Sequence, residues 1–92
     1  MLLNDIRDVL RAGPDHDKEI QDLINAAKAE MKSKGIAQSK IIETDPLIAR
    51  AINCYCKANY GYDNPEADRF QQSYDSLVTH MSLSSDYVEV TT

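Results

Sequence analysis

Four residues of this sequence carry the imidazole or thiol groups that most often bind transition metals or act as nucleophiles: His16, His80, Cys54 and Cys56. The two histidines lie far apart in the chain, and neither has the nearby Cys or carboxylate spacing that metal sites use. We therefore expect both histidines to be solvated surface residues. The sequence also contains no HExxH, GxSxG, paired CxxC or phosphate-binding glycine motif.

The two cysteines stand two residues apart in a segment with helical periodicity. Side chains at positions i and i+2 of a helix diverge by about 200°, so Cys54 and Cys56 cannot meet. We expect neither a disulfide nor a shared metal ion, which fits a reducing compartment.

A group of carboxylates invites a different chemistry, because Asp15, Asp17, Glu19 and Asp22 could in principle bind a cation. The loop glycine and the ligand spacing of a calcium-binding EF-hand are missing. These carboxylates instead crowd the start of a predicted helix, where they complement the positive end of the helix dipole. We therefore predict no catalytic, cofactor-binding or metal-binding residue, and we expect that the protein is not an enzyme.

Apolar residues recur at steps of three and four in four segments, which predicts an all-α fold, a small bundle of about four helices. The first helix is expected over residues 4–11, with Asn4 as its cap and Gly13-Pro14 as its stop. The second runs over about residues 15–34 and is expected to end at Gly35, in a left-handed conformation.

The third and fourth helices are each predicted by a cap followed by proline. Thr44-Asp45-Pro46 starts the third helix, which stops before Gly61, and Asn64-Pro65 starts the fourth, which reaches about Leu83. Their apolar faces are expected to consist of Leu47, Ile48, Ala51, Ile52, Tyr55 and Ala58 in the third helix, and of Ala67, Phe70, Tyr74, Leu77, Val78 and Met81 in the fourth.

A chain of 92 residues has room for one core, so we expect one helical domain over residues 1–85. Residues 86–92 favour a strand but have no second strand to pair with, which predicts a short extended C-terminal tail or arm. Aromatic and strand-like positions give the predicted interface residues: Tyr60, Tyr62, Tyr87, Val88 and Val90.

The charge balance argues against two kinds of partner. Ten Lys and Arg stand against fifteen Asp and Glu, a formal charge of −5, which disfavours tight binding to DNA or to an anionic membrane. The apolar runs are too short to span a bilayer and no signal peptide is recognisable, so we expect a cytoplasmic protein without a membrane partner. A small helical DNA-associated regulatory protein is the alternative, although the fourth segment offers three acidic residues against the single Arg69.

Several segments, taken in order, resemble one known family. Residues 45–52 read DPLIARAI, and residues 60–70 read YGYDNPEADRF. Together with residues 10–11, 15–27, 73–77 and 83–84, they are similar in order, spacing and total length to the head-tail connector (adaptor) proteins of tailed bacteriophages.

This resemblance implies a structural protein of the virion, made in the host cytoplasm from a phage or prophage gene. Members of that family form a homo-oligomeric ring, commonly twelvefold, between the portal protein of the DNA-packed head and the next head-completion or tail protein. DNA only passes through the channel of such a ring. We expect the isolated subunit to be monomeric, because it has limited apolar surface to bury against copies of itself.

Overall fold

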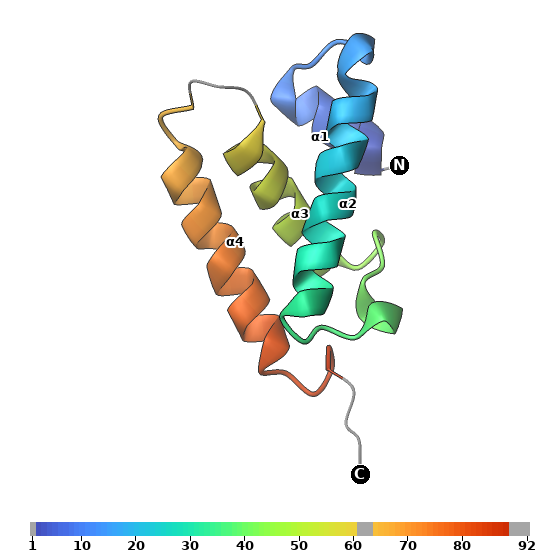
Figure 1. The fold of residues 1–92 in the computed structure, drawn as a ribbon, viewed down its shortest axis with the longest axis vertical. Helices are drawn as coiled ribbons and strands as arrows, with labels where there is room; N and C mark the ends of the chain where they lie inside the picture. Colours follow the sequence, from blue (N-terminus) through green and yellow to red (C-terminus); the bar gives the residue numbers. More distant parts are fainter. Residues whose placement is uncertain (1, 61–63, 89–92) are drawn as a thin grey trace.

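The computed structural model describes residues 2–60 and 64–88 of the chain. In these residues the chain forms four α-helices and two short 3-10 helices (Figure 1). Their bounds are Leu2–Leu10 for α1, Pro14–His16 for η1, Asp17–Ser33 for α2, Gln38–Lys40 for η2, Pro46–Asn59 for α3 and Ala67–Ser82 for α4. The predicted all-α bundle is confirmed.

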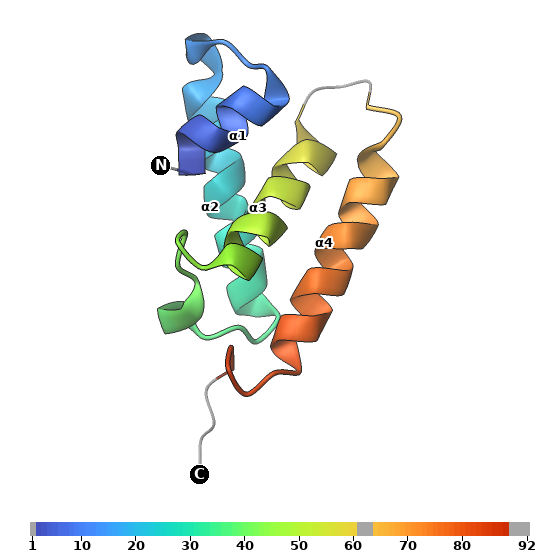
Figure 2. The ribbon, with the colours of Figure 1, turned by 180° about the vertical axis from the view of Figure 1, so that it is seen from behind.

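Helix α3 lies at the centre of the bundle. It packs against α4 on one side and against α2 and α1 on the other. Helices α2, α3 and α4 run alternately up and down, and α1 lies beside the first turns of α2 (Figures 1 and 2). Because α1 also contacts α3, the four helices share one core.

The buried residues come mainly from the predicted apolar faces. Ile48, Ala51 and Ile52 of α3 are fully buried, as is Cys56, which the predicted face did not include. Phe70 of the predicted α4 face is only half-buried, and Val9 of α1 is 45% exposed. The remaining core positions of α1, α2 and α4 are Leu2, Ile6, Ile20, Ile24, Ala27, Met31, Tyr74, Val78 and Met81.

Two predicted helix ends are confirmed in detail. The Asp45 carboxylate accepts the backbone N–H groups of Leu47 and Ile48, at 2.9 and 3.3 Å, and Pro46 is the first residue of α3. At the end of α2, Gly35 has a φ of +101°, which glycine adopts without steric cost. Local sequence alone therefore determined where α2 ends and where α3 begins.

The predicted ends of the first helix were wrong. Helix α1 begins at Leu2, so Asn4 lies inside it, and its side-chain oxygen accepts from the Arg7 guanidinium at 3.1 Å. The helix ends because Arg11 takes a φ of +55°, which lets the Ala12 N–H reach the Arg7 carbonyl at 3.0 Å. A non-glycine residue therefore provides the left-handed stop that Gly13-Pro14 was expected to give.

Asn64 does not cap the fourth helix, which begins at Ala67 rather than at Pro65. The Asn64 side-chain oxygen accepts the Glu66 N–H at 3.1 Å, and the Asn64 side-chain amide donates to the Lys57 carbonyl near the end of α3. Asn64 therefore links the end of α3 to the segment before α4. Residues 65–66 form a turn, and the helix begins after it.

The chain after α4 folds back onto the bundle at the end opposite α1 (Figure 1). The Ala37 N–H donates to the Tyr87 carbonyl at 2.8 Å. The Tyr87 hydroxyl donates to the Asp45 carboxylate, 3.1 Å from each oxygen. Tyr87 thus joins the α2–α3 connection and the cap of α3, whereas the division of the chain at residue 85 stays a prediction.

Truncation tests that division. A chain ending at Ser85 is expected to keep its helical circular dichroism but to lose about 2 kcal/mol of unfolding free energy, because it lacks the Tyr87 packing and its hydrogen bonds. The melting temperature should fall by about 10 °C for a domain of this size. A chain ending at Val88 is the control and should melt like the full chain. Equal melting temperatures for both truncations would show that Tyr87 contributes nothing to stability.

Candidate functional site

A cavity of about 510 Å³ opens between α1, α3 and α4. Three of the ten Lys and Arg residues line it, together with an aromatic ring and small polar side chains. We call this surface the basic groove and define it by Arg50, Asn53, Lys57, Arg69, Phe70 and Ser73.

The helical repeat explains why these side chains meet. Arg50, Asn53 and Lys57 follow one another at steps of three and four along α3, so they share one face of that helix. Arg69 and Ser73 are four residues apart on α4. Helices α3 and α4 pack side by side (Figure 2). The polar residues of both helices therefore line the same groove.

Phe70 lies between two of the cations. The Lys57 Nζ is 5.1 Å from the centre of the Phe70 ring, and the Arg69 Cζ is 5.2 Å from it. Cations at these distances are attracted by the negative face of an aromatic ring. The Phe70 ring therefore attracts the ammonium group of Lys57 from α3 and the guanidinium group of Arg69 from α4, so both cations lie beside it in the groove.

The groove keeps a positive balance in spite of nearby carboxylates. Glu66 pairs with Arg69 at 3.2 Å, and Asp5 of α1 stands at the edge of the groove. Arg50 is exposed and forms no ion pair with any described residue.

The buried Asn53 Oδ1 has no hydrogen-bond partner among the described residues. Guanidinium, ammonium and aromatic groups in this arrangement can bind a carboxylate or a phosphate.

The groove continues beyond the central cavity at both ends. A hollow of about 410 Å³ shares Arg50 and Arg69 with it and runs along α4 to Leu77. Another of about 290 Å³ shares Lys57 and Phe70 and is completed by apolar atoms of α1 and by Tyr60. The surface is therefore long, with cations in the middle and apolar side chains toward α1.

A second charged surface lies on the first turns of α2. Asp15, Glu19 and Asp22 line a shallow hollow of about 460 Å³ with Lys18 and Leu23. Lys18 pairs with Asp22 at 3.1 Å, but both side chains are well exposed, so water screens the pair. We call Asp15, Glu19, Asp22 and Leu23 the acidic strip.

Asp17, the other carboxylate of this acidic segment, has a different role. Its two oxygens accept from the Arg7 guanidinium at 3.0 and 3.1 Å, which joins α1 to the start of α2. His16 and His80 are both exposed, as expected, and His16 Nδ1 lies 3.4 Å from the Glu19 carboxylate. In the described part of the chain, no group of three or more His, Cys, Asp or Glu side chains could hold a metal ion.

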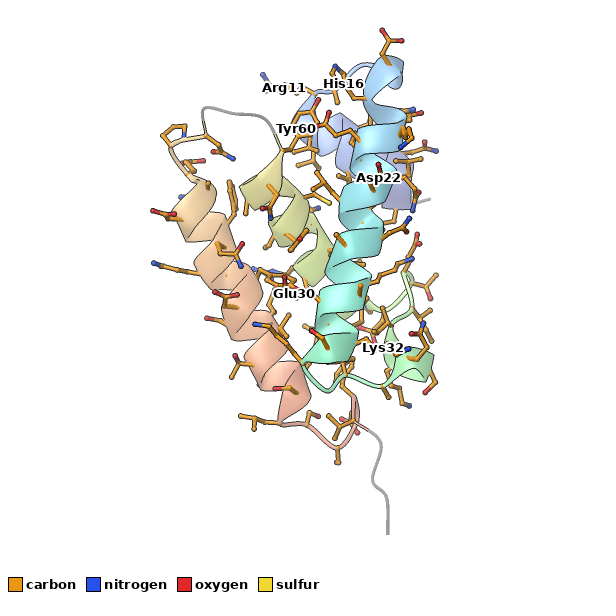
Figure 3. The ribbon with its side chains drawn as sticks, in the orientation of Figure 1. Arg11, His16, Asp22, Glu30, Lys32 and Tyr60 are labelled. Atoms are coloured by element: carbon orange, nitrogen blue, oxygen red, sulfur yellow. The ribbon has the colours of Figure 1, made fainter. Side chains whose placement is uncertain are left out.

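The predicted interface residues do not gather at one place. Tyr60 is half-buried at the α1 end of the bundle, with its ring edge-on to His16 at 5.9 Å between ring centres (Figure 3). Tyr87 and Val88 follow α4 and lie by the α2–α3 connection, where the Tyr87 carbonyl accepts the Ala37 N–H and the Val88 N–H donates to the Ser84 carbonyl. Tyr62 and Val90 lie outside the described residues. An interface role for all five stays a prediction.

The residues of the basic groove were not predicted as a site. The spacing of polar residues contained the signal, since Arg50 and Lys57, seven residues apart, lie on one face of α3, and Arg69 and Ser73, four residues apart, lie on one face of α4. A net charge of −5 for the whole chain obscures this local positive cluster. The cluster becomes visible only when α3 and α4 are placed together.

Two ionisable side chains, Cys56 of α3 and Tyr74 of α4, are fully buried. Cys54 and Cys56 are both free thiols, and burial raises the pKa of Cys56 to about 12. Burial also raises the pKa of Tyr74, and the negative charge of Glu30 raises it further. Glu30 is a residue of α2, and its side chain lies on the side of that helix that faces α4 (Figure 3). The neutral forms of both buried groups are therefore the ones that the fold stabilises.

The unfolding free energy is expected to fall as the pH rises from 9 to 12. The unfolded chain releases the Cys56 proton from its ordinary pKa of 9.0 upward, whereas the folded chain keeps it until about pH 12. This contribution is complete below pH 9 and is lost at up to about 1.4 kcal/mol per pH unit. Urea unfolding at pH 9 and at pH 10 measures this loss of unfolding free energy. Cys56→Ala should flatten the slope, and an unchanged slope would contradict this origin.

The chain was compared with known proteins and with the requirements of a membrane span. None of the described helices is long and apolar enough to cross a membrane. Searches of curated proteins and of solved structures found no match. A family model described as "Phage connector protein" matches residues 2–88, which include all the described helices and both charged surfaces. The chain therefore belongs to the phage connector protein family.

Proposed function

We propose that this protein is one subunit of a ring that joins the portal of a phage head to the next connector or tail component. The observation that carries the proposal is the family match, which extends over residues 2–88 and so covers nearly the whole chain. Membership of the family gives the protein a structural connector role in the phage particle. The ring, its portal contact and its passage for DNA are the finer parts of the proposal.

The physical properties of the chain support a subunit of a larger assembly. The bundle is small and elongated, with extents of 47 × 25 × 19 Å, and a domain of this size has a thin margin of stability alone. Contacts with partners add to that margin. The formal charge of −5 also suits a channel, because carboxylates facing the phosphates keep DNA from binding as it passes.

The proposed partners are copies of this chain, the portal protein, and a head-completion or tail protein. The subunit is made in the host cytoplasm and ends in the virion, at the interface of head and tail. A ring of twelve is the proposed stoichiometry. Because the portal acts as a template, the free subunit is proposed to remain monomeric at about micromolar concentration.

Light scattering and electron microscopy test this function. The protein is measured alone and after mixing with the portal protein of the same phage. We expect a monomer alone and a ring of subunits on the portal in the mixture. A subunit that stays monomeric and leaves the portal bare would contradict the proposal.

One observation favours the alternative, a small helical DNA-associated regulatory protein. Arg50, Lys57 and Arg69 form a local positive surface of the kind that contacts phosphates. A gel shift at low salt separates the two functions, since electrostatic binding to DNA is strongest there. We expect no retardation of duplex DNA, and retardation that Arg50→Glu removes would favour the alternative.

A further inference from the structure

We propose that the basic groove receives the acidic strip of a second copy of this chain, and that this pair of surfaces is the contact repeated around the ring. The inference rests on the proposed function, which it deepens by naming the two halves of the subunit contact. It is carried by the charges, the apolar side chains and the positions of the two surfaces.

The charges of the two surfaces are complementary. The groove presents the exposed guanidinium groups of Arg50 and Arg69, and the strip presents the carboxylates of Asp15, Glu19 and Asp22. Opposite charges across an interface speed encounter and fix its register, and a guanidinium can bind a carboxylate through two parallel hydrogen bonds. A strip against a groove therefore places unlike charges together, whereas two grooves or two strips would place like charges together.

Each surface also offers an apolar side chain among its charged groups. Phe70 is half-buried in the groove, between Lys57 and Arg69, and Leu23 is half-buried in the strip. Specific interfaces combine a buried aromatic or aliphatic centre with a polar rim. Leu23 can cover Phe70 while the carboxylates beside it meet Lys57 and Arg69 next to the ring.

The positions of the two surfaces favour a ring over a twofold dimer. Figure 2 looks onto α1, α3 and α4, which line the groove, whereas Figure 3 looks from the opposite side onto α2 and Asp22. Two different surfaces on different sides of a subunit make a head-to-tail contact, and such contacts repeat until the ring closes. A twofold dimer would need one surface that is complementary to itself.

A second copy fits the groove better than DNA does. The chain as a whole carries −5, so a phosphate backbone that reached Arg50 and Arg69 would also meet an excess of carboxylates. One of these, Asp5, stands at the edge of the groove itself. The strip of a neighbouring subunit brings three carboxylates, which match the three cations of the groove in number, whereas a phosphate backbone continues past the groove along the acidic remainder of the surface.

Paired charge reversals test the contact. The groove variant carries Arg50→Glu and Arg69→Glu, and the strip variant carries Glu19→Lys and Asp22→Lys. The portal protein of the same phage is mixed with one variant, or with both variants in equal amounts. Ring formation is then measured by electron microscopy and sedimentation velocity. Circular dichroism confirms beforehand that each variant is folded.

Each variant alone is expected to need at least about ten times more protein than the wild type to form rings, because like charges then face each other. The equimolar mixture should return to within about threefold of the wild type. In it the acidic groove of one variant meets the basic strip of the other, and the unchanged groove and strip meet at the next contact. An alternating ring is therefore restored.

The contrary outcomes are distinct. If either variant alone forms rings like the wild type, or if both fail and their mixture also fails, the pairing of groove and strip is overturned and the ring function stands. If the wild type itself forms no ring on the portal, the proposed function fails, and this inference fails with it. Loss of DNA retardation by the groove variant, with normal ring formation, would assign the groove to nucleic acid instead.

A matched control separates contact from total charge. Lys32→Glu with Lys40→Glu changes the net charge by the same amount as the groove variant, and both lysines are exposed. They lie on α2 and η2, away from the residues of the groove and the strip. This control is expected to form rings like the wild type. Equal impairment by the control and the groove variant would overturn the proposal.

Discussion

Replacing Tyr74 by alanine is expected to lower the unfolding free energy by about 3–5 kcal/mol. The Tyr74 side chain is 0% exposed, and its ring packs edge-on against Tyr55 of α3, with 5.1 Å between ring centres. Its removal leaves a cavity where α4 meets α3, and small domains have only about 5–15 kcal/mol in total. Urea unfolding followed by circular dichroism measures the loss.

Tyr74→Phe is the matched control. The Tyr74 hydroxyl is buried and makes no hydrogen bond with any described residue, so phenylalanine keeps the ring packing and removes an unsatisfied polar group. The unfolding free energy should therefore change by less than about 1 kcal/mol. A loss as large as that of Tyr74→Ala would mean that the hydroxyl, not the ring, holds α4 in place.

Replacing Asp45 by alanine is expected to cost about 2–3 kcal/mol, because one carboxylate serves two elements. It caps α3 by accepting the Leu47 and Ile48 N–H groups, a role worth about 1 kcal/mol. It also accepts the Tyr87 hydroxyl, and a hydrogen bond to a charged group contributes about 1.5–3 kcal/mol where it is buried. This bond is only partly buried, so its share lies at the lower end of that range. Thermal and urea unfolding measure the sum.

A double-mutant cycle separates the two roles of Asp45. Tyr87→Phe removes only the hydroxyl, and Asp45→Asn keeps a good helix cap while removing the charge. We expect the effects of Asp45→Ala and Tyr87→Phe to be non-additive by about 0.5–1.5 kcal/mol, as for residues in direct contact. Strict additivity would show that the contact between Tyr87 and Asp45 contributes nothing, and that Asp45 acts only as the cap.

Much of this protein was predictable from short stretches of sequence. The repeat of apolar residues determined that the fold is all-α, and it placed Ile48, Ile52 and Val78 in the core. Asp45-Pro46 and Gly35 determined two helix ends through their own backbone preferences. The order and spacing of such segments also carried the resemblance to phage connectors, which the family match confirms. Each of these signals acts over a few residues or along a single helix.

Only the tertiary structure decided which distant segments share a surface. Tyr87 meets Asp45 across 42 positions of the chain, and its strand-like neighbours gave no sign that it folds back onto its own bundle. Arg50 and Arg69 come from different helices, so their common groove exists only once α3 and α4 are packed. The physical reason is the same in both cases. Periodicity determines which face of a helix is polar or apolar, whereas the packing of the helices determines which faces meet.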